Sequence, residues 1–124
     1  MSKFKESVLK AVNLVPKGKV VSYGQVALMV GIPRAAIQVG WVLHQHGDRV
    51  PWWRVVNKKG RISTTCMEHN ANMQKTLLEK DGVKVSKDLA VDMRIHRFIP
   101  DESFLGKLNL DDAYVQLLID KYGV

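Results

Sequence analysis

The sequence predicts a compact α/β domain that is mainly helical: a winged helix-turn-helix domain with a small β-hairpin wing and a C-terminal extension. Three observations predict this class. Two helical segments are separated by a short turn with glycine, a lysine-rich turn lies between two short apolar runs, and positive charge is concentrated in the first half. With 124 residues, 46% hydrophobic and 25% charged, the chain is long enough for one modest core.

The first two helices are predicted from a periodicity and from a cap. Apolar residues recur at helical intervals near the N-terminus and predict a helix from Ser2 to about Asn13. Ser22, with Gln25 three residues later, matches a capping box and predicts that a second helix begins there. This helix is expected to continue to about Val30.

A third helix is predicted from Arg34 to His46. Gly31 is a natural end for the preceding helix, Pro33 fits the first turn of the next one, and Gly47 follows its last residue. Two helices joined by a short turn with glycine form a helix-turn-helix pattern. The spacing alone is not specific, because two packed helices in any small domain can show it.

A lysine-rich turn follows. The short runs 54–56 and 61–63 flank the sequence Asn57-Lys58-Lys59-Gly60 and predict a hairpin, or wing. Lys58 and Lys59 at its tip are suited to rest on a phosphate backbone. A solvated turn is an equally good interpretation of the sequence.

Three elements are predicted beyond the wing. They are a helix over 68–80, a strand over 91–95 from alternating apolar residues, and an amphipathic helix over 111–122. We expect residues 1–86 to form the domain and residues 87–124 to form an extension that packs on it or binds a partner. The acidic tail is not expected to lie on DNA.

Positive charge is placed unevenly. Residues 1–62 hold 11 Lys and Arg against two acidic residues, a net charge of +9, whereas residues 63–124 hold 8 against 10, a net charge of −2. A basic half joined to a mildly acidic one favours a surface for a polyanion. A generic basic surface is the alternative.

Composition also excludes several classes. No apolar run approaches the ~18–20 residues of a membrane span, and the N-terminus has no signal-peptide pattern. The single cysteine, Cys66, excludes an internal disulfide and suits a reducing compartment. No spacing typical of a zinc site is present, so neither a metal nor a cofactor is expected. We expect a monomer that is cytoplasmic (nucleoid-associated), or nuclear in a eukaryote, with no membrane partner.

The order of several motifs carries a family resemblance. Over about residues 5–86 the chain resembles the DNA-binding domain of the O6-alkylguanine-DNA alkyltransferases, through the runs Val20-Val21-Ser22-Tyr23-Gly24-Gln25-Val26-Ala27, Gly31-Ile32-Pro33, Gln38-Val39-Gly40 and Pro51-Trp52-Trp53-Arg54-Val55-Val56. In that family the pentapeptide is Pro-Cys-His-Arg-Val, and its Cys thiolate takes the alkyl group. Trp52 stands at the Cys position and Trp53 at the His position. An indole neither accepts a methyl group readily nor deprotonates a neighbour. The chain therefore resembles the alkyltransferase-like proteins, which are not enzymes.

The resemblance implies binding to double-stranded DNA with alkylated guanine, without alkyl transfer, as a mark for nucleotide excision repair proteins. In the family, the second helix of the pair enters the minor groove, and small side chains allow its close approach. The family tyrosine that crowds the phosphate matches Tyr23. The resemblance also implies nucleotide flipping: the family turns the damaged nucleotide out of the base stack, and an arginine fills the space that it leaves. The position of this arginine is Ile37 in this sequence. An aliphatic wedge can occupy an opened base step, but it cannot hydrogen-bond the orphaned base. Arg34, one helical turn earlier, is the alternative.

The residues expected to act fall into two groups. The lesion pocket is expected at Tyr23, Trp52, Trp53, Arg54 and Met67. The DNA-binding surface is expected at Ser22, Tyr23, Arg34, Ala35, Ala36, Ile37, Gln38, Gly40, Lys58 and Lys59.

Within the pocket, Trp52 is expected to face the base and Trp53 to pack, while Arg54 supports the loop or lies over an aromatic face. For the small residues Ala35, Ala36 and Gly40 of the predicted third helix, tight packing between helices is the alternative explanation. Asp81 matches the family acid that orients the catalytic His, and with Trp53 in that place we expect a surface or capping residue.

Two other functions remain open from the sequence. A winged-helix transcription factor could use the same scaffold to read undamaged DNA, and the isoleucine at the arginine position favours it. A relocated nucleophile at Cys66 would make the chain an alkyltransferase, although no activating partner lies at a fixed spacing.

Overall fold

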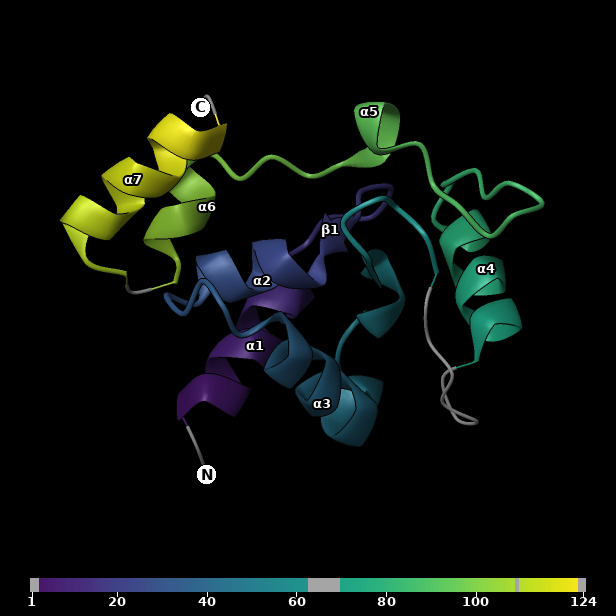
Figure 1. The fold of residues 1–124 in the computed structure, drawn as a ribbon, viewed down its shortest axis with the longest axis horizontal. Helices are drawn as coiled ribbons and strands as arrows, with labels where there is room; N and C mark the ends of the chain where they lie inside the picture. The colour runs from purple at the N-terminus through teal and green to yellow at the C-terminus, as the bar shows by residue number, and fades with distance from the viewer. Residues whose placement is uncertain (1–2, 63–69, 109, 123–124) are drawn as a thin grey trace.

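The computed structural model describes residues 3–62, 70–108 and 110–122. Along the chain, the helices and strands are α1 (Lys3–Asn13), β1 (Val21–Ser22), α2 (Tyr23–Met29), α3 (Ala36–His46), the 3-10 turns η1 (Gly47–Arg49) and η2 (Trp52–Arg54), β2 (Val55–Val56), α4 (Ala71–Lys80), α5 (Met93–His96), α6 (Glu102–Gly106) and α7 (Asp112–Tyr122). The mainly helical class with a small two-stranded sheet is confirmed. Figure 1 shows α1, α2 and α3 grouped together, with α4 to one side and α6 and α7 to the other.

The predicted helix-turn-helix is present as α2 and α3. Ser22 caps α2, since its Oγ accepts the Gln25 backbone N–H at 3.0 Å. The Gln25 side chain does not complete the capping box, because its Oε1 accepts no hydrogen bond; its Nε2 donates to the Phe98 carbonyl. Gly31 ends the helix in a left-handed conformation (φ +85°), which disfavours residues with a Cβ. The third helix begins at Ala36, two residues later than expected.

One hydrophobic core unites the N-terminal helices with the C-terminal extension. Val8 of α1, Val26 of α2 and Val39 of α3 are all fully buried in one cluster, which also contains Leu105 of α6 and Leu118 of α7. The extension therefore packs on the domain.

The small sheet differs from the expected hairpin. Val55 and Val56 of β2 pair in parallel with Val21 and Ser22 of β1. Among the described residues, β2 therefore pairs with β1 and not with the run after the wing turn, as the predicted hairpin would require. Both valines of β2 are buried: Val55 belongs to the main core cluster, and Val56 belongs to a second cluster that also contains Val20, Ile62, Leu78, Val83, Val85 and Val91. The hairpin's last expected residue, Ser63, lies outside the described residues.

The wing turn itself is well defined. The Asn57 N–H donates to the Arg61 carbonyl at 3.0 Å, and Arg61 forms an antiparallel bridge with Ala90. Gly60 has a φ of +86°, and a Cβ there would lie 2.4 Å from the Val91 carbonyl oxygen. Glycine is thus required by both conformation and space.

The expected strand over 91–95 is wrong. Val91 forms a single antiparallel bridge with Val85, and the chain then turns into the short helix α5. Asp92 caps this helix by accepting the Arg94 backbone N–H at 3.0 Å. The alternating apolar residues were compatible with a strand, but the aspartate among them favours a helix start.

The other C-terminal elements agree with the sequence. α7 confirms the helix predicted over 111–122, and the Tyr114 hydroxyl donates to the Leu28 carbonyl of α2. α4 confirms the helix ending at Lys80, capped by Asn70, whose Oδ1 accepts the Met73 N–H at 2.8 Å. Its expected first residues, 68 and 69, and Ser2 of the first helix lie outside the described residues. Within the described part of the chain, no helix has the length and apolar character needed to cross a membrane.

Candidate nucleic-acid interface

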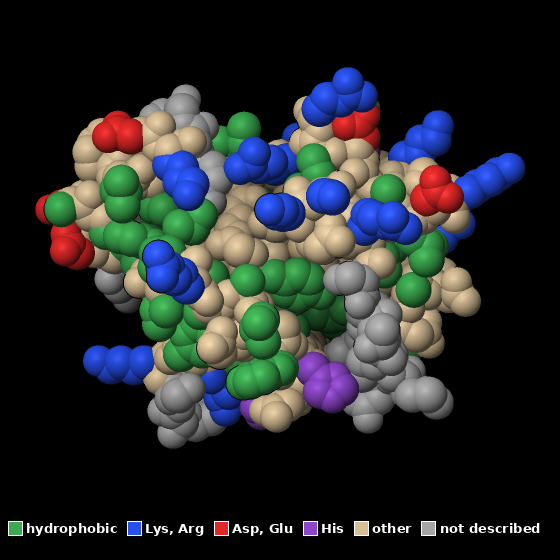
Figure 2. Space-filling model, in the orientation of Figure 1, with side chains coloured by type: hydrophobic (Ala, Val, Ile, Leu, Met, Phe, Trp, Pro, Cys, Tyr) green, Lys and Arg blue, Asp and Glu red, His purple; other side chains and the backbone are tan. Residues whose placement is uncertain are grey.

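A pocket of about 430 Å³ lies where the start of α2, the exposed face of α3 and the wing turn meet. Its lining residues are Tyr23, Gly24, Ala36, Ile37, Gly40, Asn57 and Lys58. Figure 2 shows a hollow with hydrophobic side chains at its floor near the centre of one face, with Lys and Arg side chains gathered above it. Five of these residues were expected from the sequence, and Gly24 and Asn57 were not.

Helix α3 turns one face to the core and the other to the pocket. Ala35, just before α3, is only 5% exposed and belongs to the core cluster, so its side chain packs in the core and does not line the pocket. Ala36 and Gly40 line the pocket. A Cβ built at Gly40 would meet nothing within 4 Å. Internal packing therefore explains the small residue at position 35, but not the glycine at position 40.

Ile37 is 69% exposed on the pocket side of α3. Arg34 and Gln38 are exposed as well. The side chain of Tyr23 is half-buried where α2 begins, and it packs against the main core. The pocket is thus lined by four of the expected DNA-binding residues of the helix-turn-helix, Tyr23, Ala36, Ile37 and Gly40. The Ser22 hydroxyl instead caps α2.

The wing turn presents Lys58 and Lys59 to solvent on a fixed backbone. The Oδ1 atom of Asn57 accepts the backbone N–H of Lys59 at 2.9 Å and that of Arg61 at 3.0 Å. Both lysine side chains are exposed. A rigid turn lowers the entropy lost when these lysines meet a phosphate, since only their side chains need to be ordered.

The two tryptophans of η2 lie edge to face, with ring centroids 6.1 Å apart. Trp52 is 8% exposed and belongs to the main core cluster, whereas Trp53 is partly buried between the two clusters. Trp52 is thus the more buried of the two, the reverse of the expected arrangement. Among the described residues, neither tryptophan lines the pocket. Met67 and Cys66 lie outside the described residues.

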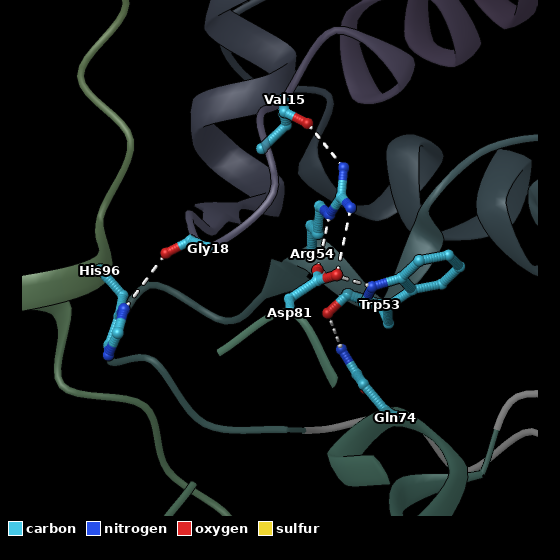
Figure 3. Close-up of polar contacts among 7 residues, drawn as sticks. All are labelled: Val15, Gly18, Trp53, Arg54, Gln74, Asp81 and His96. Atoms are coloured by element: carbon cyan, nitrogen blue, oxygen red, sulfur yellow. Dashed lines mark hydrogen bonds and ion pairs between the residues drawn. The ribbon is translucent and has the colours of Figure 1, made fainter. Parts of the chain in front are cut away.

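A buried ion pair fixes η2 to the end of α4 (Figure 3). Arg54 Nε lies 2.7 Å from Asp81 Oδ2, Arg54 Nη2 lies 3.2 Å from Asp81 Oδ1, and the Trp53 indole N–H donates to Oδ2 at 2.9 Å. Arg54 also donates to the Val15 carbonyl at 2.9 Å. The Asp81 side chain is 7% exposed, so it is not a surface residue; it stands at the C-terminal cap of α4.

The charges of this cluster shift the Asp81 titration. Burial raises the pKa of the Asp81 carboxyl group, but hydrogen bonds from Arg54 and Trp53, with the charges of Arg54 and Lys17, outweigh burial and lower the pKa. The Arg54 guanidinium carbon also lies 5.5 Å from the Trp53 ring centroid, within reach of a cation–π interaction. Arg54 therefore has both of its expected roles: it supports the loop and lies over the Trp53 ring.

Gln74 of α4 was missed in the sequence. It is 1% exposed, and its Nε2 donates to the backbone carbonyls of Trp53 at 3.0 Å and Val55 at 2.9 Å. A glutamine within an amphipathic helix carries no sign of burial. Trp41 was also missed: it is 63% exposed on α3. Its spacing of four residues from Ile37 was the available signal.

The described residues offer no site for a metal ion. Across residues 3–62, 70–108 and 110–122, no group of three or more His, Cys, Asp or Glu side chains could hold one.

Comparison with known proteins places the chain among DNA-binding proteins. Residues 3–83 match the family described as 6-O-methylguanine DNA methyltransferase, DNA binding domain. A DNA base-flipping protein of Vibrio parahaemolyticus is 34% identical over 102 residues, which cover 81% of this chain and 100% of that protein. Alkyltransferase-like protein 1 of Schizosaccharomyces pombe is 41% identical over 87 residues, covering 68% of this chain and 81% of that protein. The crystal structure of S. pombe Atl1 in complex with damaged DNA containing O6-carboxymethylguanine has a TM-score of 0.73 and 34% identity, covering 81% of this chain and 98% of that one.

Proposed function

Because the chain belongs to the family of the 6-O-methylguanine DNA methyltransferase DNA-binding domain, we propose that it binds O6-alkylguanine in duplex DNA without transferring the alkyl group. One observation carries this proposal. By resemblance, Trp52 stands at the family's cysteine position, and its side chain is packed in the core, 8% exposed. The position offers no thiol to accept an alkyl group, and Trp53 beside it offers no base.

We propose this pocket as the place where an extruded nucleotide enters the protein. Its volume of about 430 Å³ lies within the range of small-molecule sites, roughly 300–1,000 Å³. Extruding a base costs a few kcal/mol, and least for a damaged base, so the lesion itself favours capture. The Vibrio parahaemolyticus relative is a DNA base-flipping protein, which supports this step.

The surface around the pocket suits a minor groove. Ala36 and Gly40 present little bulk on α3, and Gly40 leaves open space that a groove wall can fill. The groove is about 6 Å wide, so small side chains allow the closest approach. Lys58 and Lys59 of the wing turn, with Arg34 before α3, are placed to meet phosphates and to make binding depend on salt.

The biological role follows from capture without repair. A protein that holds an alkylated guanine but leaves it unchanged is useful as a mark for nucleotide excision repair proteins. We propose this role for a monomer that acts wherever the DNA is, in the cytoplasm at the nucleoid or in the nucleus of a eukaryote.

The test is a titration of the protein with two matched duplexes at physiological salt, one with O6-methylguanine and one with guanine. We expect at least tenfold tighter binding to the lesion, about 1.4 kcal/mol, and no methyl group on the protein by mass spectrometry. Equal affinity would contradict the proposal, and a sequence-specific footprint on undamaged DNA would then establish a transcription factor.

A methyl group found on the protein would instead indicate an alkyltransferase. The variant Cys66→Ser provides the control. Loss of the transferred methyl group in this variant would assign the nucleophile to Cys66.

A further inference from the structure

Helix α3 exposes two large apolar side chains on one face. Ile37 is 69% exposed and Trp41 is 63% exposed. Residues four apart on a helix lie about 5–6 Å from each other at their Cβ atoms, so the two side chains are neighbours. Gly40, which precedes Trp41 on α3 and also lines the pocket, adds no side chain to this surface.

The stability of the fold does not explain why these two exposed residues are apolar. Both side chains remain mostly in water, where large apolar groups contribute little to stability. Other exposed apolar residues occur, such as Leu117 on α7, but Ile37 lines the pocket and Trp41 lies one turn along the same helix. Adjacent exposed apolar side chains at the rim of a pocket are typical of an interaction surface.

The charges nearby indicate what this surface meets. Arg34 is exposed in the turn just before α3, and Lys58 lines the same pocket as Ile37. Figure 2 shows Lys and Arg side chains on the face that contains the hydrophobic hollow. Apolar side chains flanked by cations favour nucleic acid, because the cations meet phosphates while the apolar groups meet bases.

The bulk of the Trp41 indole also limits which DNA conformation α3 can approach. The minor groove of B-form DNA is about 6 Å wide, too narrow for a helix with an outward tryptophan to approach as closely as Gly40 allows. Proteins that bind the minor groove often insert apolar side chains between base steps and so open them. A tryptophan near the groove therefore requires a base step that is already open or easily opened.

We propose that Trp41 extends Ile37 into a two-residue wedge: Ile37 stands, by resemblance, at the base step emptied by the extruded nucleotide, and Trp41 stacks on an exposed base beside it. This proposal rests on the proposed function and deepens it. The wedge supplies apolar contact and stacking where the family uses the hydrogen bonds of an arginine. With this wedge, the affinity for DNA depends on how easily a base step opens.

The experiment compares dissociation constants for duplexes with O6-methylguanine and with guanine, measured by fluorescence anisotropy of a labelled duplex. The variants are Trp41→Ala, Trp41→Phe and, as matched control, Leu117→Ala. Leu117 is also apolar and 57% exposed, and it lies on α7, away from α3 (Figure 1). We expect Trp41→Ala to weaken binding to the lesion duplex about tenfold, Trp41→Phe to restore most of the loss, and Leu117→Ala to change neither constant. Circular dichroism verifies that each variant is folded.

The two proposals can fail separately. If the unmodified protein prefers the lesion but Trp41→Ala binds it within twofold of the unmodified protein, the wedge is wrong and the lesion function stands. If the unmodified protein binds both duplexes equally, the lesion function is wrong. The wedge then still requires Trp41→Ala to weaken binding to both, and unchanged binding overturns it.

Discussion

The indole N–H of Trp53 donates a 2.9 Å hydrogen bond to the Asp81 carboxylate. The two residues are 28 positions apart, and the bond joins η2 to the end of α4. By resemblance, the family places a histidine and an acid at these positions, and the acid orients the histidine. The hydrogen bond shows that the acid keeps a partner at this position although the histidine is gone. Asp81 now fixes the position of an indole and of Arg54.

Replacing Asp81 removes the carboxylate that Arg54 and Trp53 share. Asp81→Asn leaves the Arg54 guanidinium, 14% exposed, without its counter-ion. Breaking a buried pair in this way costs about 3 kcal/mol of the free energy of unfolding. Urea denaturation followed by circular dichroism measures the loss. Asp92→Asn is the matched control, since its Arg94 partner is 91% exposed and little change is expected. Equal effects of the two substitutions would contradict the structural role of Asp81.

The same carboxylate makes stability depend on pH. The pKa of Asp81 in the folded protein is lowered, so ionisation is easier in the folded state than in the unfolded state. Its contribution is fully present above the ordinary aspartate pKa of about 3.9 and is lost as pH falls through the lower folded-state value. The difference in urea midpoint between the unmodified protein and Asp81→Asn should therefore shrink from pH 7 to pH 3. A difference that stays constant would show that charge is not the cause.

Local features of this fold were predictable from the sequence. Ser22 caps α2 because a serine before a helical run is a short-range signal, readable from its neighbours. Gly60 is required in the wing turn for a local reason of backbone conformation. The helix-turn-helix followed from its capping and turn residues, such as Ser22 and Gly31, and α7 followed from an apolar periodicity within a dozen residues.

Tertiary relationships were not predictable in the same way. Burial of Asp81 depends on Arg54, 27 residues away, and only the fold brings the two together. The exposure of Trp41 contradicts its hydropathy, since a tryptophan in a helix is expected to pack. Burial of Gln74 contradicts its polarity in the same sense, and its backbone hydrogen bonds in η2 and β2 explain it. Sequence patterns report what a residue prefers, whereas these positions depend on what faces them.

The wing turn offers a test of phosphate binding. Lys58→Ala should weaken binding to damaged and undamaged duplexes by the same factor, because phosphates are present in both. The slope of log K against log salt should fall by about one unit. Lys107→Ala is the matched control, since Lys107 is exposed at the end of α6. Loss of affinity for the damaged duplex alone would mean that Lys58 contacts the lesion and not a phosphate.

Ile37 can be tested by restoring the residue type of the family. The side chain is 69% exposed, so Ile37→Arg is expected to leave the fold intact. It should strengthen binding to the O6-methylguanine duplex, because a guanidinium can hydrogen-bond the orphaned base and adds a charge near phosphates. Competition titrations at two salt concentrations measure the gain. Unchanged or weaker binding would place Ile37 outside the emptied base step.

The relationship between Trp53 and Asp81 predicts how alkyl transfer could be regained. Trp52→Cys introduces a thiol with an ordinary pKa of about 8.5, which is mostly protonated at neutral pH. Trp53 cannot take its proton, so this variant should transfer methyl groups very slowly. In Trp52→Cys/Trp53→His, the carboxylate that now accepts the indole N–H can accept an imidazole N–H and orient the ring as a base.

We expect the double variant to transfer methyl groups from O6-methylguanine to the protein at least tenfold faster than Trp52→Cys, as measured by mass spectrometry over time. General base catalysis typically contributes 10²–10⁴-fold, so a tenfold gain allows for imperfect geometry. Trp52 is buried, and its loss costs about 3–5 kcal/mol, so thermal melts must show that both variants are folded. Adding Asp81→Asn to the double variant should abolish most of the gain. If that third substitution has no effect on the rate, Asp81 holds the loop together but does not orient the base.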